Sequence, residues 1–547
     1  MNNRKDVIVL DIETNTAHDT IWMCGLMVNY GTPQYVTTPQ ELQTILSTAK
    51  AVVGHNIIGF DKPILESCWK IDFSGIDIVD TLVMSRLLEP DMEGGHSLKA
   101  WGKRIVVNKM EFDTEDFDGG LTDEMIEYCL RDVDVTYHLY HVLLRKLEDF
   151  SSYSIDLEHD VATITAQQIK NGFKLDISVA SNWHTEMCER LAEISEELQA
   201  IFPPIVTIRW SEKTGKRLKD NIEIFNVASR QQIAKRLETL GVVWKEFTET
   251  GQAVINEKTL DIPVPEAQLC KEYLQLVKLK GMADSWLTSV DKATDRIHGY
   301  VNPCGAVTGR MTHSRPNLAQ IPSLPIARQC FTVDMGNVLV GCDASGLELR
   351  MLAHYMNDDA YTQEILHGDI HTANQNAAGL SERNQAKTFI YAFLYGAGDA
   401  KIGSIVGGTA SDGKQLKEKF LRNTPTLSKL RENVSRNART GYLTGLDGRK
   451  VHVRSEHAAL NTLLQSAGAI VMKVAIKLCV QKLKANGIPF KLVAQVHDEF
   501  QFEAPQHFGK AVGMIARQSI IDAGIELGLN CPLDGEYRIG TNWSQTH

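Results

Sequence analysis

"LVAQVHDEFQFEA" spans Leu492 to Ala504 and places His497, Asp498 and Glu499 between two apolar runs. Short runs of this kind are typical of β-strands, so the stretch predicts a hairpin with a tight acidic turn. Acids at a turn are commonly no more than solvated. The alternative is that the hairpin carries a carboxylate to a metal ion that another segment of the chain also binds.

The composition is that of an ordinary globular protein with more than one domain. The chain has 547 residues, of which 43% are hydrophobic and 23% charged, and this length exceeds a single typical core. The formal net charge of -11 gives no overall basic signature, so any contact with nucleic acid has to come from local patches. The 10 cysteines show no CxxC spacing, which favours free thiols in a reducing cytoplasm and predicts no structural zinc.

Two apolar stretches were considered as targeting or membrane segments. The run Val7 to Leu10 near the N-terminus is far too short for a signal peptide. The stretch "AGAIVMKVAIKLCV" is interrupted by Lys473 and Lys477, which indicates an amphipathic helix and not a membrane span. We therefore expect no membrane association and a cytoplasmic protein.

The clearest change in pattern lies at "EDFSSYSIDLEHD", around Ser151 to Ser154. An α/β pattern precedes it and a long helix-rich stretch follows it. We therefore expect one domain over residues 1–150 and a second over residues 151–547.

Four acids and a tyrosine mark the first of these domains. Asp11 and Glu13 end an apolar run and point the same way on a strand. "AVVGHNIIGFD" leads to Asp61, and Tyr128 and Asp132 lie four residues apart on one face of a predicted helix. Taken singly, an acid after a strand is more often an ordinary loop residue, and Tyr128 is ordinary packing.

In order and context, "DIE", "NIIGFD" and "YCLRD" resemble the three motifs of proofreading exonucleases with a ribonuclease-H-like fold. The resemblance implies an active 3'-5' exonuclease in which two divalent ions are held by four acids and Tyr128 positions the attacking water. The chemistry suits this set, because phosphodiester hydrolysis uses one ion to make hydroxide and another to neutralise the leaving oxygen. Magnesium prefers oxygen ligands. The implied ligands are Asp11, Glu13, Asp61 and Asp132.

Two further segments carry chemistry in the remainder of the chain. A strand-like run ends at Asp343 in "NVLVGCDASGLELRMLAHY" and is followed by helical periodicity. "RNQAKTFIYAFLYGAG" places Arg383, Lys387, Tyr391 and Tyr395 at steps of four on one helical face. Without context, this face could be an amphipathic surface. Two cations and flat aromatics could instead receive a triphosphate and a stacked base.

Together with "VHDE", these segments resemble motifs A, B and C of family A DNA polymerases, and "GAVTGRMTHSRPNLAQIP" and "GLDGRKVHVRSEHAALNTLLQSAGA" resemble further stretches of that family. The resemblance spans nearly the whole chain and is nearest to the replicative polymerases of podophages. It implies an α/β exonuclease domain of ribonuclease-H-like fold followed by an α+β right-hand polymerase domain with palm, fingers and thumb. The expected ranges are about 191–300 for the thumb, 301–360 and 441–547 for the palm, and 361–440 for the fingers.

The resemblance also implies a role for each residue of the polymerase site. Asp343 and Asp498, with the backbone carbonyl of Ala344, would hold two Mg²⁺ ions, and Mn²⁺ is expected to substitute. Glu499 would be a weaker, supporting acid. Lys387 would neutralise phosphate and is a candidate proton donor to the leaving pyrophosphate.

Nucleotide and DNA contacts follow from the same resemblance. Arg383 and His371 would contact the triphosphate, Tyr391 with Glu348 would exclude a 2'-hydroxyl, and Tyr395 would stack near the template base. For His371, a satisfied structural histidine is an equal alternative. Duplex DNA would be contacted by Arg310, His497, Asn461 and Gln465.

The implied activity is DNA-directed DNA polymerisation with 3'-5' proofreading in phage replication, with primer-template DNA and deoxynucleoside triphosphates as substrates. A monomer in the host cytoplasm is expected, and a phage helicase-primase and a single-stranded DNA-binding protein are candidate partners. Because the segment between Phe202 and Phe225 is short, we expect no loop that recruits thioredoxin, and we expect no N-terminal 5' nuclease domain. The alternatives are an exonuclease-dominated processor, a non-catalytic DNA-binding scaffold and a related RNA polymerase. Intact acids at both sites argue against the first two, and Glu348 with Tyr391 and the exonuclease motifs argue against the third.

Overall fold

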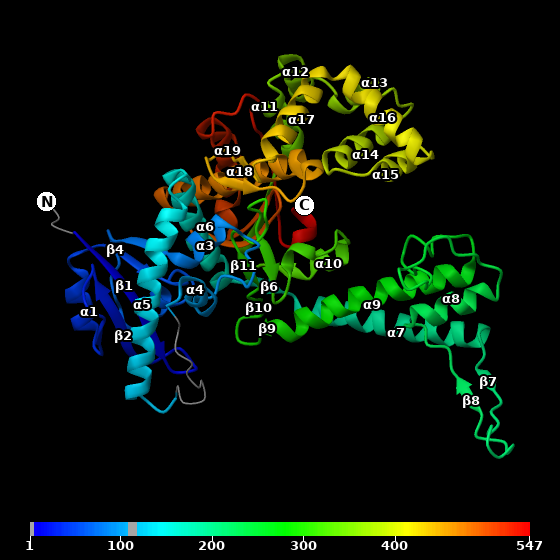
Figure 1. The fold of residues 1–547 in the computed structure, drawn as a ribbon, viewed down its shortest axis with the longest axis horizontal. Helices are drawn as coiled ribbons and strands as arrows, with labels where there is room; N and C mark the ends of the chain where they lie inside the picture. Colours follow the sequence, from blue (N-terminus) through cyan, green and yellow to red (C-terminus); the bar gives the residue numbers. More distant parts are fainter. Residues whose placement is uncertain (1–4, 108–117) are drawn as a thin grey trace.

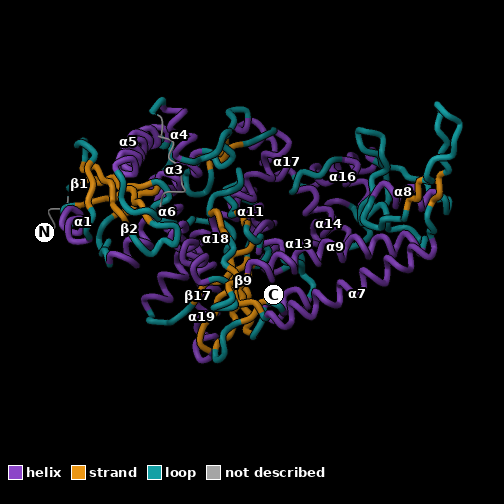
Figure 2. The backbone as a smooth tube through the Cα atoms, turned by 90° about the horizontal axis from the view of Figure 1, so that it is seen from below, coloured by secondary structure: helices purple, strands orange, loops and turns teal. Residues whose placement is uncertain are grey.

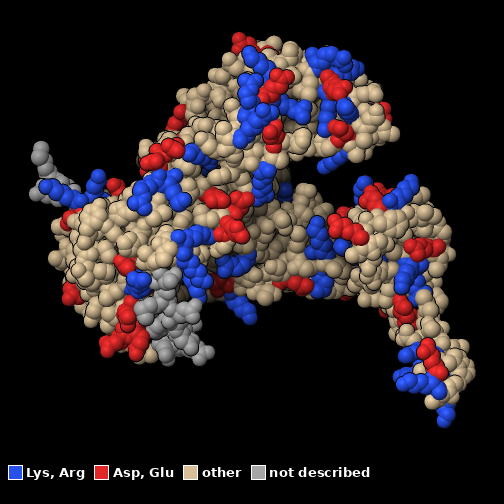
Figure 3. All heavy atoms as spheres, in the orientation of Figure 1, with Lys and Arg blue, Asp and Glu red and all other residues tan. Residues whose placement is uncertain are grey.

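The computed structural model describes residues 5–107 and 118–547. Figure 1 shows an N-terminal α/β unit on one side, a central sheet with long helices, a helical lobe above it and a pair of long helices that extends to the opposite side. A hollow separates the helical lobe from the long helix pair, and Lys and Arg side chains lie on its border together with Asp and Glu side chains (Figure 3). Basic groups are therefore present at this hollow despite the negative net charge.

The N-terminal unit is built on a mixed five-stranded sheet. Its strand order is β3-β2-β1-β4-β5, in which β1 is antiparallel to β2 and parallel to β4. The continuous apolar run at its centre is buried on both faces, as expected for a central strand. The strands are β1 (Asp6–Thr14), β2 (Ile21–Val28), β3 (Gln34–Val36), β4 (Ala49–Gly54) and β5 (Asp77–Asp80).

Helices cover this sheet, and the longest of them packs directly on β1 and β2. Gly25 permits this close approach, because a Cβ at that position would come within 2.7 Å of Cys129 Sγ. The helix therefore lies tightly over the strand that carries Asp11 and Glu13. The helices of this unit are α1 (Pro39–Leu46), α2 (Asp61–Ile64), α3 (Thr81–Leu88), α4 (Leu98–Ile105) and α5 (Asp123–Lys146).

The central sheet contains the predicted hairpin. Strands β17 (Lys491–Val496) and β18 (Glu499–Pro505) are joined by His497 and Asp498, which confirms the two strands and the tight turn. The sheet order is β17-β18-β14-β19, all antiparallel, with β14 (Asn337–Ala344) at the centre and β19 (Gly535–Gly540) at the edge. α18 (Ala459–Ala485) and α19 (Gly509–Glu526) pack together, and α19 lies on this sheet.

One helix, within Glu456–Ala485, is long and apolar enough to cross a membrane, but 78% of its most apolar window is buried inside the protein. It is the core helix α18. The amphipathic interpretation of this stretch was wrong, because buried side chains surround the helix on all sides. Lys473 is itself only 1% exposed, since it pairs with Glu158.

The helical lobe consists of seven helices that surround the phenylalanines of one apolar cluster, including Phe389 and Phe420. In Figure 2 it lies apart from the N-terminal unit, across the central sheet. Its helices are α11 (Leu347–Met356), α12 (Asp359–His367), α13 (Ile370–Ala378), α14 (Arg383–Leu394), α15 (Asp399–Ile405), α16 (Ala410–Asn423) and α17 (Pro425–Ala438).

The long helix pair is α7 (Ile177–Ile201) and α9 (Pro265–Ser289), which pack along each other. Between them the chain forms α8 (Arg230–Glu238) and a two-stranded hairpin, β7 (Ile205–Thr207) and β8 (Asn221–Glu223), which projects beyond the helices in Figure 1. Short strands lie at the base of this pair. They are β6 (Phe173–Leu175), β9 (Val290–Asp291), β10 (Arg296–Ile297) and β13 (Phe331–Thr332) in one sheet, and β11 (Tyr300–Asn302) with β12 (Thr312–Ser314); α10 (Pro325–Gln329) contacts α7. A separate pair, β15 (Tyr442–Thr444) with β16 (Lys450–His452), packs on α17 and α18.

Helix α6 (Ser152–Asn171) joins the N-terminal unit to the rest through a buried ion cluster. Glu158 is fully buried and pairs with both Arg449 and Lys473, and Arg449 also pairs with Asp447 at 2.6 Å. On the same helix, His159 Nε2 accepts the backbone N–H of Asp80 at 2.9 Å. Neighbouring residues of α6 therefore contact both parts of the molecule.

Substitution of Glu158 by Ala is expected to destabilise the protein by about 3–5 kcal/mol, because it leaves the Lys473 ammonium buried without its carboxylate. Denaturation by urea, followed by circular dichroism, measures this loss. The matched control is Asp149→Ala, which breaks an exposed pair with Lys450 and should cost about 0–1 kcal/mol. Equal effects of the two substitutions would contradict the role of the buried cluster.

Candidate active sites

The first site lies where β14 ends beside the tip of the β17–β18 hairpin. Asp343 pairs in register with Glu499, and the backbone N–H of Ala344 donates to the carbonyl oxygen of Asp498 at 3.0 Å. This bond ties the segments of Asp343 and Asp498, which lie 155 positions apart in the sequence, to one edge of the sheet. His497 adopts a left-handed backbone with φ of 56°, which lets the turn close within two residues.

The electrostatics of this edge favour a cation. Burial, followed by the charges of Asp498, Glu499, Glu348 and Glu536, raises the pKa of Asp343 to about 7. Burial also raises the pKa of Asp498, followed by the charge of Glu348. Carboxylates that repel one another in this way are stabilised when a divalent ion lies between them. The donor set is all oxygen and therefore fits Mg²⁺ or Mn²⁺.

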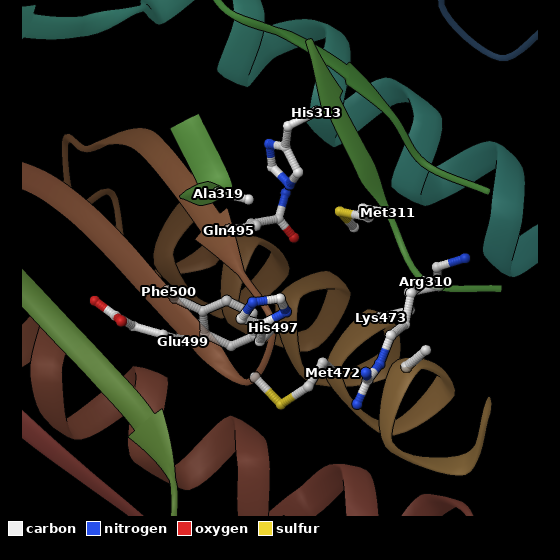
Figure 4. Close-up of a pocket in the computed structure, with 11 residues that line it drawn as sticks. Arg310, Met311, His313, Ala319, Met472, Lys473, Gln495, His497, Glu499 and Phe500 are labelled. Atoms are coloured by element: carbon white, nitrogen blue, oxygen red, sulfur yellow. The ribbon is translucent and has the colours of Figure 1, made fainter. Parts of the chain in front are cut away.

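Glu499 has a different environment from its neighbour Asp498. Its carboxylate is 5% exposed, accepts a hydrogen bond from Trp543 Nε1 at 2.7 Å, and contacts Gln501 and His547. Figure 4 shows the Glu499 side chain directed away from the Arg310 side of the cavity. Glu499 therefore anchors the hairpin to the C-terminal segment.

The helix α14 presents the predicted face to solvent. Its opposite face, which includes Ala386, Phe389 and Ile390, is fully buried, so Arg383, Lys387 and Tyr391 remain on the outer side. Tyr395 lies immediately after the last helical residue, and the chain leaves the helix there. The steps of four thus bring these side chains to one side of the helix, as the spacing indicated.

Glu348, in the first turn of α11, links the end of α14 to Arg310. Tyr395 donates its hydroxyl to Glu348 Oε1 at 3.0 Å, and Arg310 lies 3.7 Å from the same oxygen. The pKa of Tyr391 is raised by burial and then by the charges of Glu348 and Asp498, which places this tyrosine near the acids. The sequence predicted Tyr391 as the partner of Glu348, and the hydrogen bond from Tyr395 to Glu348 was not predicted.

His371 lies in the first turn of α13 and faces the outer side of α14. Its ring centroid lies 6.3 Å from that of Tyr391. Burial lowers its pKa, and the charges of Arg383 and Lys387 lower it further, so the ring is neutral near pH 7. His371 is therefore close to both basic residues of α14.

A cavity lies under the hairpin, between the β11–β12 ribbon and α18 (Figure 4). Arg310 and His497 both line it, as do His313 and Gln495, which the sequence did not single out. Burial lowers the pKa of His313 to about 4, so this ring is neutral. The sequence could have pointed to His313, because this residue lies in the stretch "GRMTHS", which starts at Gly309 and also contains the predicted residue Arg310.

Asn461 and Gln465 do not line this cavity. They lie one turn apart on α18, where Gln465 Nε2 donates to Asn461 Oδ1 at 2.8 Å. Asn461 instead lines a second pocket with Phe393 and Arg431 at the border of the helical lobe. Of the predicted duplex contacts, Arg310 and His497 therefore line the first cavity and Asn461 lines the second pocket.

The second site lies in the N-terminal unit, on β1. Asp11, Glu13 and the sulfur of Cys129 have ligand atoms within 4.8 Å of one another. Asp61 Oδ1 accepts the backbone N–H of Ile12, which lies between the two acids of β1, at 3.1 Å. Burial raises the pKa of Asp61 to about 7. The three predicted acids Asp11, Glu13 and Asp61 therefore converge.

The remaining predicted residues of this site lie on α5. Asp132 is 3% exposed and follows Cys129 by one turn, while Tyr128 is half-buried. The sequence missed Cys129, although it lies directly between these two predicted residues in the chain. The oxygens of the acids fit a hard divalent ion.

Asp80 is a second residue that the sequence missed. Its buried carboxylate accepts the backbone N–H groups of Asn56 at 2.9 Å and Ile58 at 3.1 Å. It thereby fixes the loop that leads to Asp61, and the charge of Asp80 contributes to the raised pKa of Asp61. The position of Asp80 in the sequence could have identified it, because it is an aspartate that ends a strand and caps the following helix, α3.

Comparisons with known proteins cover nearly the whole chain. Residues 206–545 match the protein family described as DNA polymerase family A, and residues 5–148 match the family described as 3'-5' exonuclease. The chain is 33% identical to the DNA-directed DNA polymerase of Escherichia phage T7, over 99% of this chain and 100% of the relative, and 32% identical to that of Enterobacteria phage T3 over the same shares. The fold is similar to a solved polymerase domain of Pol1 from M. smegmatis in complex with DNA primer-template and dNTP, with a TM-score of 0.82 at 20% identity over 99% of this chain and 96% of that one.

Binding of Mn²⁺ at the Asp343–Asp498 edge is expected to weaken as the pH falls from about 8 to about 6. The pKa of Asp343 is raised to about 7, so its carboxyl is mostly ionised above that value and mostly protonated below it, and the ion has to displace the proton. Mn²⁺ titration by electron paramagnetic resonance in an Asp11→Ala, Glu13→Ala background measures this site alone. Affinity that stays constant across this range would contradict the raised pKa.

Proposed function

The chain belongs to DNA polymerase family A and has a 3'-5' exonuclease domain at its N-terminal side, and we propose that it replicates phage DNA by extending a primer 3' end and removing mismatched nucleotides. It is a DNA-directed DNA polymerase. The observation that carries the mechanism is the pairing of Ala344 with Asp498, which brings Asp343 and Asp498 to one edge of the sheet opposite the basic face of α14.

The three parts of the polymerase domain are assigned by position. We propose that the sheet β17-β18-β14-β19 with α18 and α19 is the palm, that helices α12–α17 of the helical lobe are the fingers, and that the pair α7 and α9 with α8 is the thumb. The hollow between the lobe and the helix pair would then receive the primer-template duplex (Figure 3). The Lys and Arg side chains on its border would contact the phosphate backbone.

Both domains are divalent-metal dependent, as their families are. We propose two Mg²⁺ ions at each site. Asp343 and Asp498, with the carbonyl of Ala344, would hold the ions of the polymerase site, and the ions would supply a lowered pKa for the primer 3'-hydroxyl and positive charge for the triphosphate. The acids alone repel one another, so the site is prepared for this charge.

The outer face of α14 would receive the incoming nucleotide. Arg383 and Lys387 bind the phosphates, and Lys387 is placed to give a proton to the departing pyrophosphate. Tyr391 lies beside the sugar with Glu348 and leaves no room for a 2'-hydroxyl, while Tyr395 meets the template base.

Contacts to DNA would come from the cavity under the hairpin and from α18. His497 and Arg310 line that cavity together, which supports contact with the primer terminus and the minor groove. Asn461 and Gln465 add contacts to the duplex from α18. Such contacts position DNA with little dependence on sequence, which a copying enzyme requires.

In the exonuclease domain the four acids would hold the metal ions and Tyr128 would orient the attacking water. The convergence of Asp11, Glu13 and Asp61 supports this assignment. Asp132 lies buried on the helix above them. The two sites lie on separate sheets, so each is expected to act without the other.

A 5'-labelled primer on a longer template tests this function directly. With Mg²⁺ and four deoxynucleotides the wild type should extend the primer, and without nucleotides it should shorten it. Asp498→Asn should lose extension and Asp11→Ala should lose shortening, each by at least about 100-fold, since loss of even an indirect metal contact costs about 10- to 100-fold.

Each variant serves as the control for the other, because each should keep the activity of the other site. Shortening by the wild type without any extension would contradict the polymerase assignment. Loss of both activities in Asp498→Asn would contradict two independent metal sites.

We also propose that the protein works as a monomer in the host cytoplasm with a helicase-primase and a single-stranded DNA-binding protein, and that it needs no thioredoxin. All ten cysteines are free, which suits a reducing compartment. The segment between Phe202 and Phe225 forms only the hairpin of β7 and β8. The alignment with the phage T7 polymerase spans 706 positions against the 547 residues of this chain, so the relative contains segments that this chain lacks.

Addition of reduced thioredoxin should therefore leave the product length per binding event unchanged. A heparin trap that limits each polymerase to one binding event on a long primed template measures this length. A large increase in product length with thioredoxin would contradict the proposal.

A further inference from the structure

An aspartate outside the predicted site holds the first basic residue of α14. Arg383 Nε donates to Asp369 Oδ2 at 2.6 Å, and Arg383 Nη2 donates to Asp369 Oδ1 at 2.9 Å. The carboxylate thus grips one edge of the planar guanidinium with two parallel bonds, which fixes both its position and its plane. Within the described part of the chain, Arg383 Nη1 makes no hydrogen bond or ion pair, so the other edge remains available.

The same carboxylate caps α13. Asp369 Oδ1 accepts the backbone N–H groups of His371 at 3.1 Å and Thr372 at 3.4 Å, and Oδ2 accepts the hydroxyl of Thr372 at 2.7 Å. His371 Nδ1 is buried and has no hydrogen-bond partner among the described residues, so the position of the ring depends on this first turn of α13. One side chain therefore orders both Arg383 and His371.

Stability does not account for this ion pair. The side chains of Arg383 and Asp369 are 50% and 42% exposed, and pairs exposed to this degree contribute little to folding. Arg383 is also the first residue of α14, where the helix dipole disfavours a cation. Asp369 offsets that unfavourable position and keeps the guanidinium on the side of the helix that carries Lys387.

We propose that Asp369 is a positioning residue for nucleotide binding, which holds Arg383 by its Nε–Nη2 edge so that the Nη1 edge meets the triphosphate of the incoming nucleotide. The proposal rests on the proposed function, because it takes the outer face of α14 as the nucleotide site. Asp369 touches no substrate itself. It reduces the conformational freedom that Arg383 would otherwise lose on binding.

Single-nucleotide extension under single-turnover conditions, at varied dNTP concentration and in an Asp11→Ala background, tests this proposal. Asp369→Asn preserves shape and helix capping, because Asn caps as well as Asp, but removes the charge that holds the guanidinium. We expect the apparent Kd for dNTP to rise about tenfold, since a charged hydrogen bond is lost. The Kd for primer-template should not change. The exonuclease activity, measured for Asp369→Asn without the Asp11→Ala substitution, should not change either.

Two further variants distinguish the positioning of Arg383 by Asp369 from a general loss of protein structure. Glu272→Gln breaks an arginine pair of the same geometry in the long helix pair, with Arg190 Nε to Glu272 Oε1 at 2.7 Å, and should leave the Kd for dNTP unchanged. In an Arg383→Ala background, Asp369→Asn should have no additional effect on that Kd, because Asp369 acts through Arg383.

The outcomes are distinct. Wild-type extension together with an unchanged or lower Kd for dNTP in Asp369→Asn would overturn the positioning role, and a lower Kd would mean that Asp369 competes with the nucleotide for Arg383. An equal rise in Kd with and without Arg383 would also overturn it. No extension by the wild type would instead contradict the proposed function.

Discussion

The repulsion between carboxylates that the fold holds close together is the constraint on which the central part of this structure depends. Asp343 and Asp498 repel each other, and Glu348 adds to that repulsion. The protein tolerates this because a continuous antiparallel sheet and one backbone bond, from Ala344 to Asp498, fix the two segments from behind. Glu499, which is anchored by Trp543, holds the hairpin on its other side.

The N-terminal site meets the same constraint in another way. Asp11 and Glu13 share one strand face, and Asp61 reaches them through a bond to the intervening backbone N–H. Asp80 is buried behind the loop and holds it in place through backbone donors. In each site a neighbouring acid holds the backbone that carries the candidate ligands: Glu499 in the hairpin and Asp80 in the N-terminal unit. Asp369 is proposed to hold the side chain of Arg383 in a comparable way.

The sequence predicted the parts of both sites that depend on local pattern. Alternation of apolar residues was sufficient for the hairpin, and steps of four were sufficient for the outer face of α14. Asp369 and Asp80 were missed because their partners lie 14 or more residues away, and only tertiary packing brings them together. The prediction of an amphipathic helix around Lys473 was wrong, because a lysine in an apolar helix indicates a solvated face unless it meets a buried carboxylate, here that of Glu158.

The most direct test of the account is a crystal structure of the protein with primer-template DNA, a non-hydrolysable deoxynucleoside triphosphate and Mn²⁺, recorded at a wavelength where manganese scatters anomalously. We predict two anomalous peaks between Asp343 and Asp498, about 3.5–4 Å apart, with the triphosphate on the Nη1 edge of Arg383. An absence of anomalous peaks between Asp343 and Asp498, or a triphosphate bound away from α14, would contradict the assignment of this sheet edge as the polymerase site.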